Sequence, residues 1–167
     1  DHLLENSLEP ALDEHINKLK KLDDKKAEEE FFNFRVADIA MGSGHFLIGA
    51  IDKIEKAFLN YLAERKLPGI EDELEKLRKA ALEYYSDTNL SPNIDNSQLL
   101  RRQIARRCIY GVDLNETAVD LARLSIWIHT FIPGLPLTYL NHNLIVGDSL
   151  AGIGTLDEAS ELLKKAD

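Results

Sequence analysis

The stretch Ala37-Asp-Ile-Ala-Met-Gly-Ser-Gly-His-Phe-Leu-Ile-Gly-Ala50 joins a β-rich run to a segment with the apolar periodicity of a helix. It places two of the chain's nine glycines, Gly42 and Gly44, one residue apart. A Gly-x-Gly turn between a strand and a helix lets backbone N–H groups come close to a bound group. The stretch therefore predicts a strand–turn–helix unit whose turn faces a ligand.

Outward from this turn, β-rich runs alternate with helical ones. Strands are predicted at residues 31–39, 108–113 and 143–148. Helices are predicted at residues 1–30, 46–62, 71–85, 97–107, 156–165 and between Asn115, the expected cap, and Pro133. Such alternation favours an α/β fold with a parallel, Rossmann-like sheet.

We predict three parts in the chain. A helical N-terminal segment occupies residues 1–31, and a partial Rossmann-like domain occupies residues 32–150. That domain contains a charged helical insert at about residues 65–107, and a helical tail follows at residues 151–167. The sheet is expected to be truncated, because only three strands are predicted.

Composition narrows the function classes. The 167 residues carry a formal net charge of −9, which argues against this chain alone gripping a phosphate backbone. The only cysteine, Cys108, indicates a reducing compartment, and no Cys/His cluster has the spacing of metal ligands. Neither a signal sequence nor a membrane-spanning stretch is visible. The sequence thus predicts a cytoplasmic protein without a metal site or a membrane partner.

Each predicted strand ends in an aspartate beside small or turn-forming residues. These aspartates are Asp38, Asp113 and Asp148. Because the carboxyl ends of parallel strands share one edge of the sheet, we expect all three to lie along that edge. An aspartate after the second strand is placed to accept hydrogen bonds from ribose hydroxyls. The pattern predicts a ligand that contains a nucleoside.

Two cofactor classes fit a nucleoside site. A dinucleotide site would read Gly-x-Gly-x-x-Gly, but Leu47 stands at the third glycine position. The acidic partner would also follow about 20 residues later, whereas Asp113 comes only after the helical insert. A carboxylate at Asp38 would repel a pyrophosphate and tolerate a sulfonium and an ammonium group. The electrostatics favour S-adenosylmethionine over NAD.

The motifs carry a family resemblance over most of residues 1–150. Asp38-Ile-Ala-Met-Gly-Ser-Gly-His-Phe-Leu47 resembles motif I of N6-adenine DNA methyltransferases, Asp-Pro-x-x-Gly-Ser-Gly. Ile109-Tyr-Gly-Val-Asp-Leu-Asn115 looks like their motif II, and residues 124–150 are similar to the stretch that leads into motif III. The match is to large methylases of restriction–modification and phage-defence systems, especially type IIG enzymes. Ile39 and Met41 depart from the proline and cysteine common there.

The resemblance implies S-adenosylmethionine as cofactor and a role for each matched residue. Gly42 and Gly44 would pass under the methionine portion, with Asp38 nearby. Asp113 would bind the ribose hydroxyls, and Leu114 would pack against the adenine. Asp148 would accept a hydrogen bond from the exocyclic amine of that adenine. The matched positions are Asp38, Met41, Gly42, Ser43, Gly44, Asp113, Leu114, Asn115, Asp148 and Ser149.

The family's catalytic motif, Asn/Asp-Pro-Pro-Tyr/Phe, does not occur in the chain. The five prolines include no adjacent pair. In the family this motif hydrogen-bonds the target amine and stacks on the flipped base. We therefore expect the chain to be a piece of a longer methyltransferase that binds double-stranded DNA, and to transfer no methyl group by itself.

Other interpretations stay open. The fold could serve a non-catalytic nucleotide-binding or interaction module, or it could belong to a dinucleotide-dependent oxidoreductase. The glycine pair could form a tight turn with no ligand. The densest basic patch is Arg101, Arg102, Arg106 and Arg107. It could face DNA, but a solvated helix face paired with nearby acids is the favoured interpretation.

Overall fold

The computed structural model describes residues 4–85, 92–137 and 139–149. A π-helical turn, Leu4–Leu8, leads into the first helix. The helices are α1 (Glu9–Lys21), α2 (Asp24–Glu30), α3 (His45–Glu64), α4 (Pro68–Glu83), α5 (Asn96–Arg107) and α6 (Glu116–His129). The strands are β1 (Val36–Asp38), β2 (Ile109–Asp113) and β3 (Leu144–Val146). The helix predicted at residues 156–165 lies outside the described residues.

The three strands form one parallel sheet in the order β1-β2-β3. Asp38 of β1 lies opposite Gly111, and Asp113 of β2 lies opposite Val146. The predicted alternation of strands and helices is thereby confirmed as an α/β arrangement. Because all strands run the same way, their carboxyl ends and the loops that follow them meet at one edge of the sheet.

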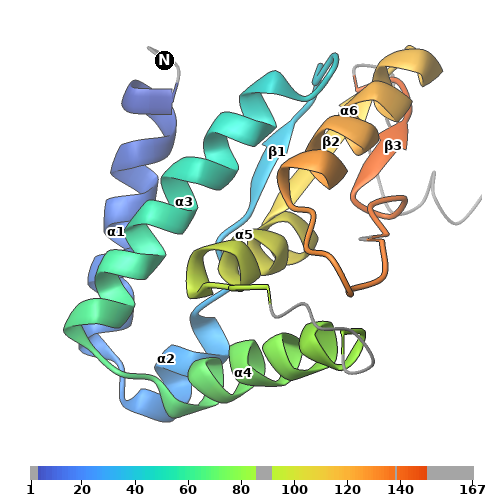
Figure 1. Ribbon diagram of the computed structural model, residues 1–167. Coiled ribbons are helices and arrows are strands. Elements are labelled where there is room, and N and C mark those ends of the chain that lie inside the picture. Colours follow the sequence, from blue (N-terminus) through green and yellow to red (C-terminus); the bar gives the residue numbers. More distant parts are fainter. Residues whose placement is uncertain (1–3, 86–91, 138, 150–167) are drawn as a thin grey trace, which may run out of the picture.

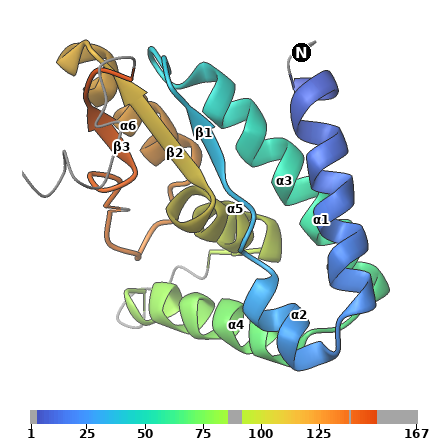
Figure 2. The same cartoon turned by 180° about the vertical axis from the view of Figure 1, so that it is seen from behind.

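Helices α3 and α6 lie on the same face of the sheet. Helix α3 contacts β1 and β2, α6 contacts β2 and β3, and α1 packs on the outer side of α3 (Figure 1). Seen from behind, β1 and β2 lie in front of these helices (Figure 2). None of the described helices combines the length and the apolar character that crossing a membrane requires.

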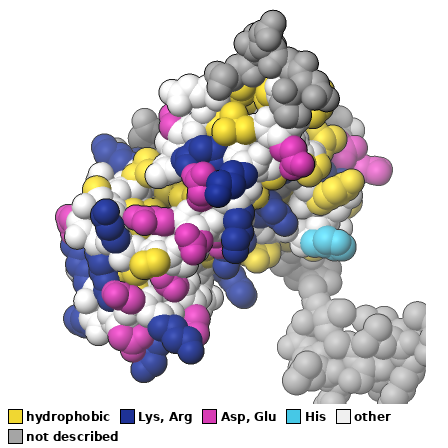
Figure 3. Space-filling model, turned by 60° about the horizontal axis from the view of Figure 1, so that its bottom comes forward, with side chains coloured by type: hydrophobic (Ala, Val, Ile, Leu, Met, Phe, Trp, Pro, Cys, Tyr) yellow, Lys and Arg dark blue, Asp and Glu magenta, His cyan; other side chains and the backbone are white. Residues whose placement is uncertain are grey.

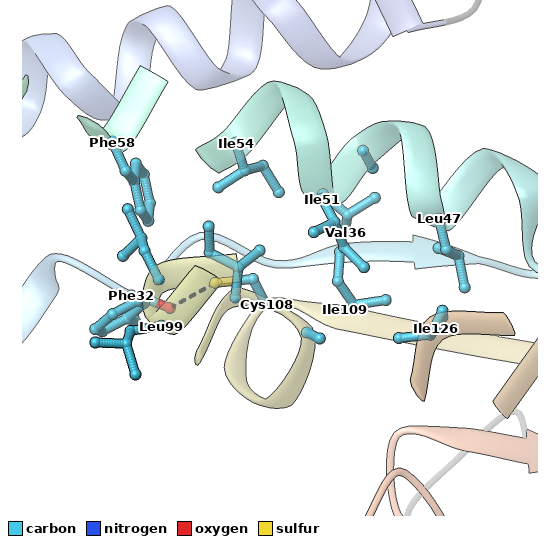
Figure 4. Close-up of a cluster of buried hydrophobic side chains, with 14 of the residues drawn as sticks. Phe32, Val36, Leu47, Ile51, Ile54, Phe58, Leu99, Cys108, Ile109 and Ile126 are labelled. Carbon is cyan, nitrogen blue, oxygen red and sulfur yellow. Dashed lines mark hydrogen bonds between the residues drawn. The ribbon is translucent and has the colours of Figure 1, made fainter. Parts of the chain in front are cut away.

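The core lies between α3 and the sheet. Leu47, Ile51, Ile54 and Phe58 recur at helical spacing along α3, and each is fully buried (Figure 4). They pack over the helix-facing side chains of the strands and over Cys108, just before β2. Burial raises the pKa of the Cys108 thiol to about 12. This cysteine is therefore part of the core.

The first strand is shorter than predicted. The strand expected at residues 31–39 is limited to Val36–Asp38, and Phe31 and Phe32 form a turn after α2. Their rings join an aromatic cluster, in which the centroids of Phe31 and Phe58 are 4.4 Å apart. The aromatic residues that indicated a strand are buried by this cluster, because β propensity largely reflects side-chain packing.

Helix α6 buries the apolar residues of one side only. Its cap is confirmed, since Asn115 Oδ1 accepts a hydrogen bond from the Thr117 N–H at 3.0 Å. Val119, Ala122 and Ile126 are buried, whereas Leu121, Leu124 and Ile128 are exposed by 49%, 48% and 62%. At 100° per residue these two sets lie on opposite sides of the helix. Only one side can face the sheet.

Helix α5 begins with a capping box that fixes its entry. The Asp95 carboxylate accepts from the Gln98 N–H at 2.9 Å, and Gln98 Oε1 accepts from the Asp95 N–H at 3.1 Å.

Asp95→Ala should lower the free energy of unfolding by about 1 kcal/mol, because it leaves a helix N–H without its acceptor. Urea unfolding measures this. Asp13→Ala, on an exposed face of α1, should stay within about 0.5 kcal/mol, and an equal loss in both variants would contradict the assignment.

Candidate functional site

The turn between β1 and α3 is held against β2 by backbone hydrogen bonds. The Met41 N–H donates to Val112 O at 3.1 Å, and the Gly44 N–H donates to Met41 O at 2.9 Å. Gly42 and Gly44 have φ angles of 52° and 80°, in the left-handed region that favours glycine. The turn thus has a fixed backbone that other residues would strain.

The two glycines serve different purposes. A Cβ on Gly44 would lie 3.0 Å from Ala122 Cβ, so this glycine lets α6 approach the turn closely. A Cβ on Gly42 would meet no atom of the described residues within 4 Å. These residues therefore leave space open beside the Gly42 backbone, as a turn that approaches a ligand would require.

Asp113 joins the end of β2 to this turn. Its Oδ2 accepts a hydrogen bond from the Gly42 N–H at 2.8 Å, and its Oδ1 accepts one from the Asn115 N–H at 2.9 Å. The bond from Asn115, followed by that from Gly42, holds the pKa of Asp113 below its usual value. An ionised carboxylate has about four acceptor positions, and the described residues occupy two of them, which leaves two for hydroxyl donors of a ligand.

The lowered pKa makes a testable link between pH and stability. The unfolded chain binds the proton of the Asp113 carboxyl more tightly than the folded chain does. The contribution of Asp113 to the free energy of unfolding is therefore fully present above the ordinary aspartate pKa of about 3.9. It is lost as the pH falls through the lower pKa of the folded protein. Titration of the Asp113 carboxyl carbon by NMR should show a midpoint below that of an unstructured aspartate. The Gly42 amide resonance should move with it. A midpoint at or above the ordinary value would contradict the two hydrogen bonds.

The other two predicted acids lie along the same edge with different partners. Asp38 Oδ1 accepts from the Ala40 N–H at 3.0 Å and so closes its own turn. Asp148 follows Gly147, whose N–H donates to Asp113 O at 3.0 Å. Of the three aspartates, Asp113 bonds directly to the glycine turn. Asp148 directly follows Gly147, the residue whose N–H bonds to Asp113. Asp38 bonds to the backbone of its own turn.

The remaining predicted residues divide by exposure. Ser43, Asn115 and Ser149 are exposed, and Leu114 is 71% exposed beside Asp113. Such an apolar side chain at the edge is available to pack on a flat ligand. Met41 is only 4% exposed, so its side chain supports the turn from beneath.

Gly111 is a residue of this site that the sequence analysis missed. A Cβ there would lie 2.3 Å from Met41 Sδ and 3.1 Å from side-chain atoms of both Leu47 and Leu144. The absence of a side chain at Gly111 therefore makes room for Met41, which in turn supports the glycine turn. A glycine inside a strand is the signal that could have indicated this close approach.

The arginines of the predicted basic patch on α5 have different surroundings in the structure. Arg101 Nε lies 2.7 Å from Glu55 Oε2, and Arg107 Nη1 lies 3.1 Å from Glu73 Oε1. Arg102 is buried at 4% exposure, where desolvation lowers its pKa. On the face drawn in Figure 3, Lys and Arg side chains lie among Asp and Glu side chains. These contacts favour the interpretation of a paired helix face over a DNA-facing patch.

Comparison with known proteins finds a distant relative of part of the chain. No protein-family model and no solved structure matches the chain. A Methanocaldococcus jannaschii protein described as "Putative type II restriction enzyme and methyltransferase" is 26% identical over 163 residues. The match covers 89% of this chain and 11% of that protein, so the chain spans only about a ninth of the relative's length. The chain is thus similar to a small part of a protein whose description combines restriction with methyl transfer.

Proposed function

We propose that this chain is the S-adenosylmethionine-binding part of a DNA adenine-N6 methyltransferase from a restriction–modification or phage-defence system. The observation that carries the proposal is the hydrogen bond from Gly42 to Asp113, which joins an open glycine turn to an ionised carboxylate with free acceptor positions. The similarity to the M. jannaschii protein supports methyl transfer as the reaction class. Adenine as the target rests on the motif resemblance.

The residues at the edge fit an adenosyl cation better than a phosphate. The described hydrogen bonds to the Asp38 and Asp113 carboxylates come from backbone N–H groups, which carry no full charge. Asp113 would hold the two ribose hydroxyls, and exposed Leu114 would pack against the adenine. Asp148 would accept from the exocyclic amine, with Ser149 beside it.

The glycine turn would take the other end of the cofactor. Gly42, Ser43 and Gly44 offer backbone close to the methionine portion, and Asp38 would face its ammonium group. When bound, the cofactor supplies an electrophilic methyl group on sulfur. This chain would contribute position and orientation, which are large terms in a transfer between two bound groups. Residues that hydrogen-bond the target amine would come from elsewhere in a longer protein, together with the DNA contacts.

Calorimetric titration of this chain tests the proposal. S-adenosylmethionine and its demethylated product should both bind, because the adenosyl contacts are shared by the two molecules. NAD should not bind, because its pyrophosphate would meet the carboxylates of this edge. Binding of NAD alone would instead support the oxidoreductase interpretation. Absence of binding by all three would contradict a cofactor site held by this chain and would favour the interaction module.

A further inference from the structure

An open pocket of about 440 Å³ lies between the end of α4 and the loop that follows α6. It is lined by Tyr84, which follows α4, and by Phe131 and Pro136 in the loop. The loop is held close to α4, because a Cβ on Gly134 would lie 2.3 Å from Ala81 O. Figure 1 shows the loop after α6 coming down toward this end of α4. The pocket is therefore bounded by two segments in direct contact.

This pocket is separate from the glycine turn. Helix α6 begins just after the carboxyl end of β2, and the loop that follows the helix leads to the start of β3. The pocket therefore lies toward the amino ends of the strands, whereas the glycine turn lies at their carboxyl ends. A ligand in this pocket would be distinct from the proposed cofactor.

Arg102 is a buried cation beside the pocket. Its Nη2 donates a hydrogen bond to the carbonyl oxygen of Pro136 in the pocket wall. Its Nε is buried, and none of the described residues accepts a hydrogen bond from it. Desolvation, followed by the like charge of Arg106, lowers the pKa of its guanidinium, and no described carboxylate offsets this. Because buried charges are normally paired, these surroundings favour an anionic partner.

Trp127 brings a second buried donor to the same pocket. Its ring contacts that of Phe131, with the two centroids 5.6 Å apart. Its Nε1 is buried and also lacks an acceptor among the described residues. In the same part of the chain, Arg123 Nε is a further unpaired buried nitrogen, but that guanidinium already donates to Leu144 O. Because a buried indole N–H usually has a partner, Trp127 favours a ligand with acceptor atoms.

The lining of the pocket suits a flat ring. Tyr84 is 72% exposed and Phe131 is 48% exposed, so both rings have free surface for a bound group. Aromatic side chains pack well against planar groups. The volume of the pocket also falls within the usual range for small ligands, about 300–1,000 Å³. The rings thus supply packing, and the two buried donors supply polarity and charge.

We propose that this pocket binds a small planar anion that carries acceptor atoms on its ring. The ring packs against Tyr84 and Phe131. The anionic group pairs with Arg102, and an acceptor on the ring receives the N–H of Trp127. The binding does not depend on the proposed reaction, because the glycine turn takes no part in it.

Titration of the chain with orotate, followed by NMR, tests the proposal. Orotate is a planar anion with carbonyl acceptors, and uracil is the same ring without the carboxylate. The chain has one tryptophan, so the indole N–H of Trp127 gives a single resonance. Orotate should move this resonance to saturation. Uracil should bind about tenfold more weakly or worse, because it lacks the group that pairs with Arg102.

The variant Arg102→Met tests the charge. It keeps an unbranched side chain and removes a buried unpaired charge, so it should fold. It should bind orotate about tenfold more weakly and leave the affinity for uracil unchanged. Arg106→Met is the matched control, because Arg106 is an exposed arginine one turn further along α5. This control should bind orotate nearly as the parent does.

The variant Tyr84→Ala tests the ring contact at an exposed position, where folding should not be affected. It should weaken orotate and uracil by the same factor, because both molecules offer the same ring. Unchanged binding of both would contradict the packing, whether or not Arg102→Met folds.

Four other results would overturn the assignment. Equal affinities for orotate and uracil would remove the need for an anion. Inorganic phosphate that moves the Trp127 resonance as strongly as orotate would remove the need for a ring. A resonance that stays in place up to the solubility limit of orotate would exclude this class of ligand. Movement of the Gly42 amide without movement of Trp127 would place orotate at the glycine turn instead.

Discussion

Replacing Gly111 with alanine is expected to lower the free energy of unfolding by about 1–3 kcal/mol, the usual range for overpacking a filled core. The new Cβ would lie 2.3 Å from Met41 Sδ and 3.1 Å from Leu47 Cδ1 and Leu144 Cδ2. These neighbours are themselves 4%, 0% and 0% exposed, so none can move into solvent without cost. Urea unfolding of the two proteins measures the loss.

The control for Gly111→Ala is Gly147→Ala, in the residue that follows β3. A Cβ on Gly147 would lie 3.5 Å from Val112 Cγ1, an ordinary contact, so this variant should unfold within about 0.5 kcal/mol of the parent. Equal losses at the two glycines would contradict the explanation by contact.

Met41→Ala in the Gly111→Ala background should recover part of the stability, because it removes the atom that the new Cβ meets. The two substitutions should therefore couple by more than 0.5 kcal/mol in a double-mutant cycle. Additive losses would show that Met41 is not the residue displaced. A shift of the Gly42 amide resonance in Gly111→Ala, absent from Gly147→Ala, would connect the contact to the glycine turn.

The sequence predicted elements well where the signal is local. Helix α3 carries its buried residues at regular spacing, and the predicted cap Asn115 stands directly before α6. Each of these features depends on neighbours within a few residues. Local physics is therefore enough to place α3 and α6 along the chain, whereas the helix predicted at residues 1–30 is interrupted between α1 and α2.

Features that depend on distant parts of the chain were predicted less well. Phe31 and Phe32 have the composition of a strand, but a ring on α3 decides their place. Leu121 and Val119 are equally apolar, and only the position of the sheet decides which one is buried. Periodicity gives the faces of a helix without saying which face the fold will cover.

The candidate site shows the same division. That Asp113 should meet the glycine turn followed from one general rule, because parallel strands end at one edge. The contact between Gly111 and Met41 follows from no such rule, since it needs the exact height of the turn over β2. The three-part division of the chain and the ligand contacts of the site residues stay predictions.

Replacing Asp113 with alanine should weaken binding of S-adenosylmethionine by about 1.5–3 kcal/mol, or roughly 10- to 150-fold. This is the usual contribution of hydrogen bonds to a charged group, and the variant also removes the acceptor that holds the Gly42 N–H. Calorimetric titration measures the loss. Asp120→Ala is the control, because Asp120 pairs with Arg123 on an exposed part of α6 and should leave the affinity unchanged.

Amide exchange in the absence of ligand separates the two roles of Asp113. Loss of the carboxylate should speed hydrogen exchange at the amides of Gly42 and Asn115, because both donate hydrogen bonds to it. Asp113→Asn keeps one oxygen acceptor but no charge, so it should retain part of the protection while losing affinity for the ribose. Faster exchange with an unchanged dissociation constant would mean that Asp113 holds the turn together and does not touch the cofactor.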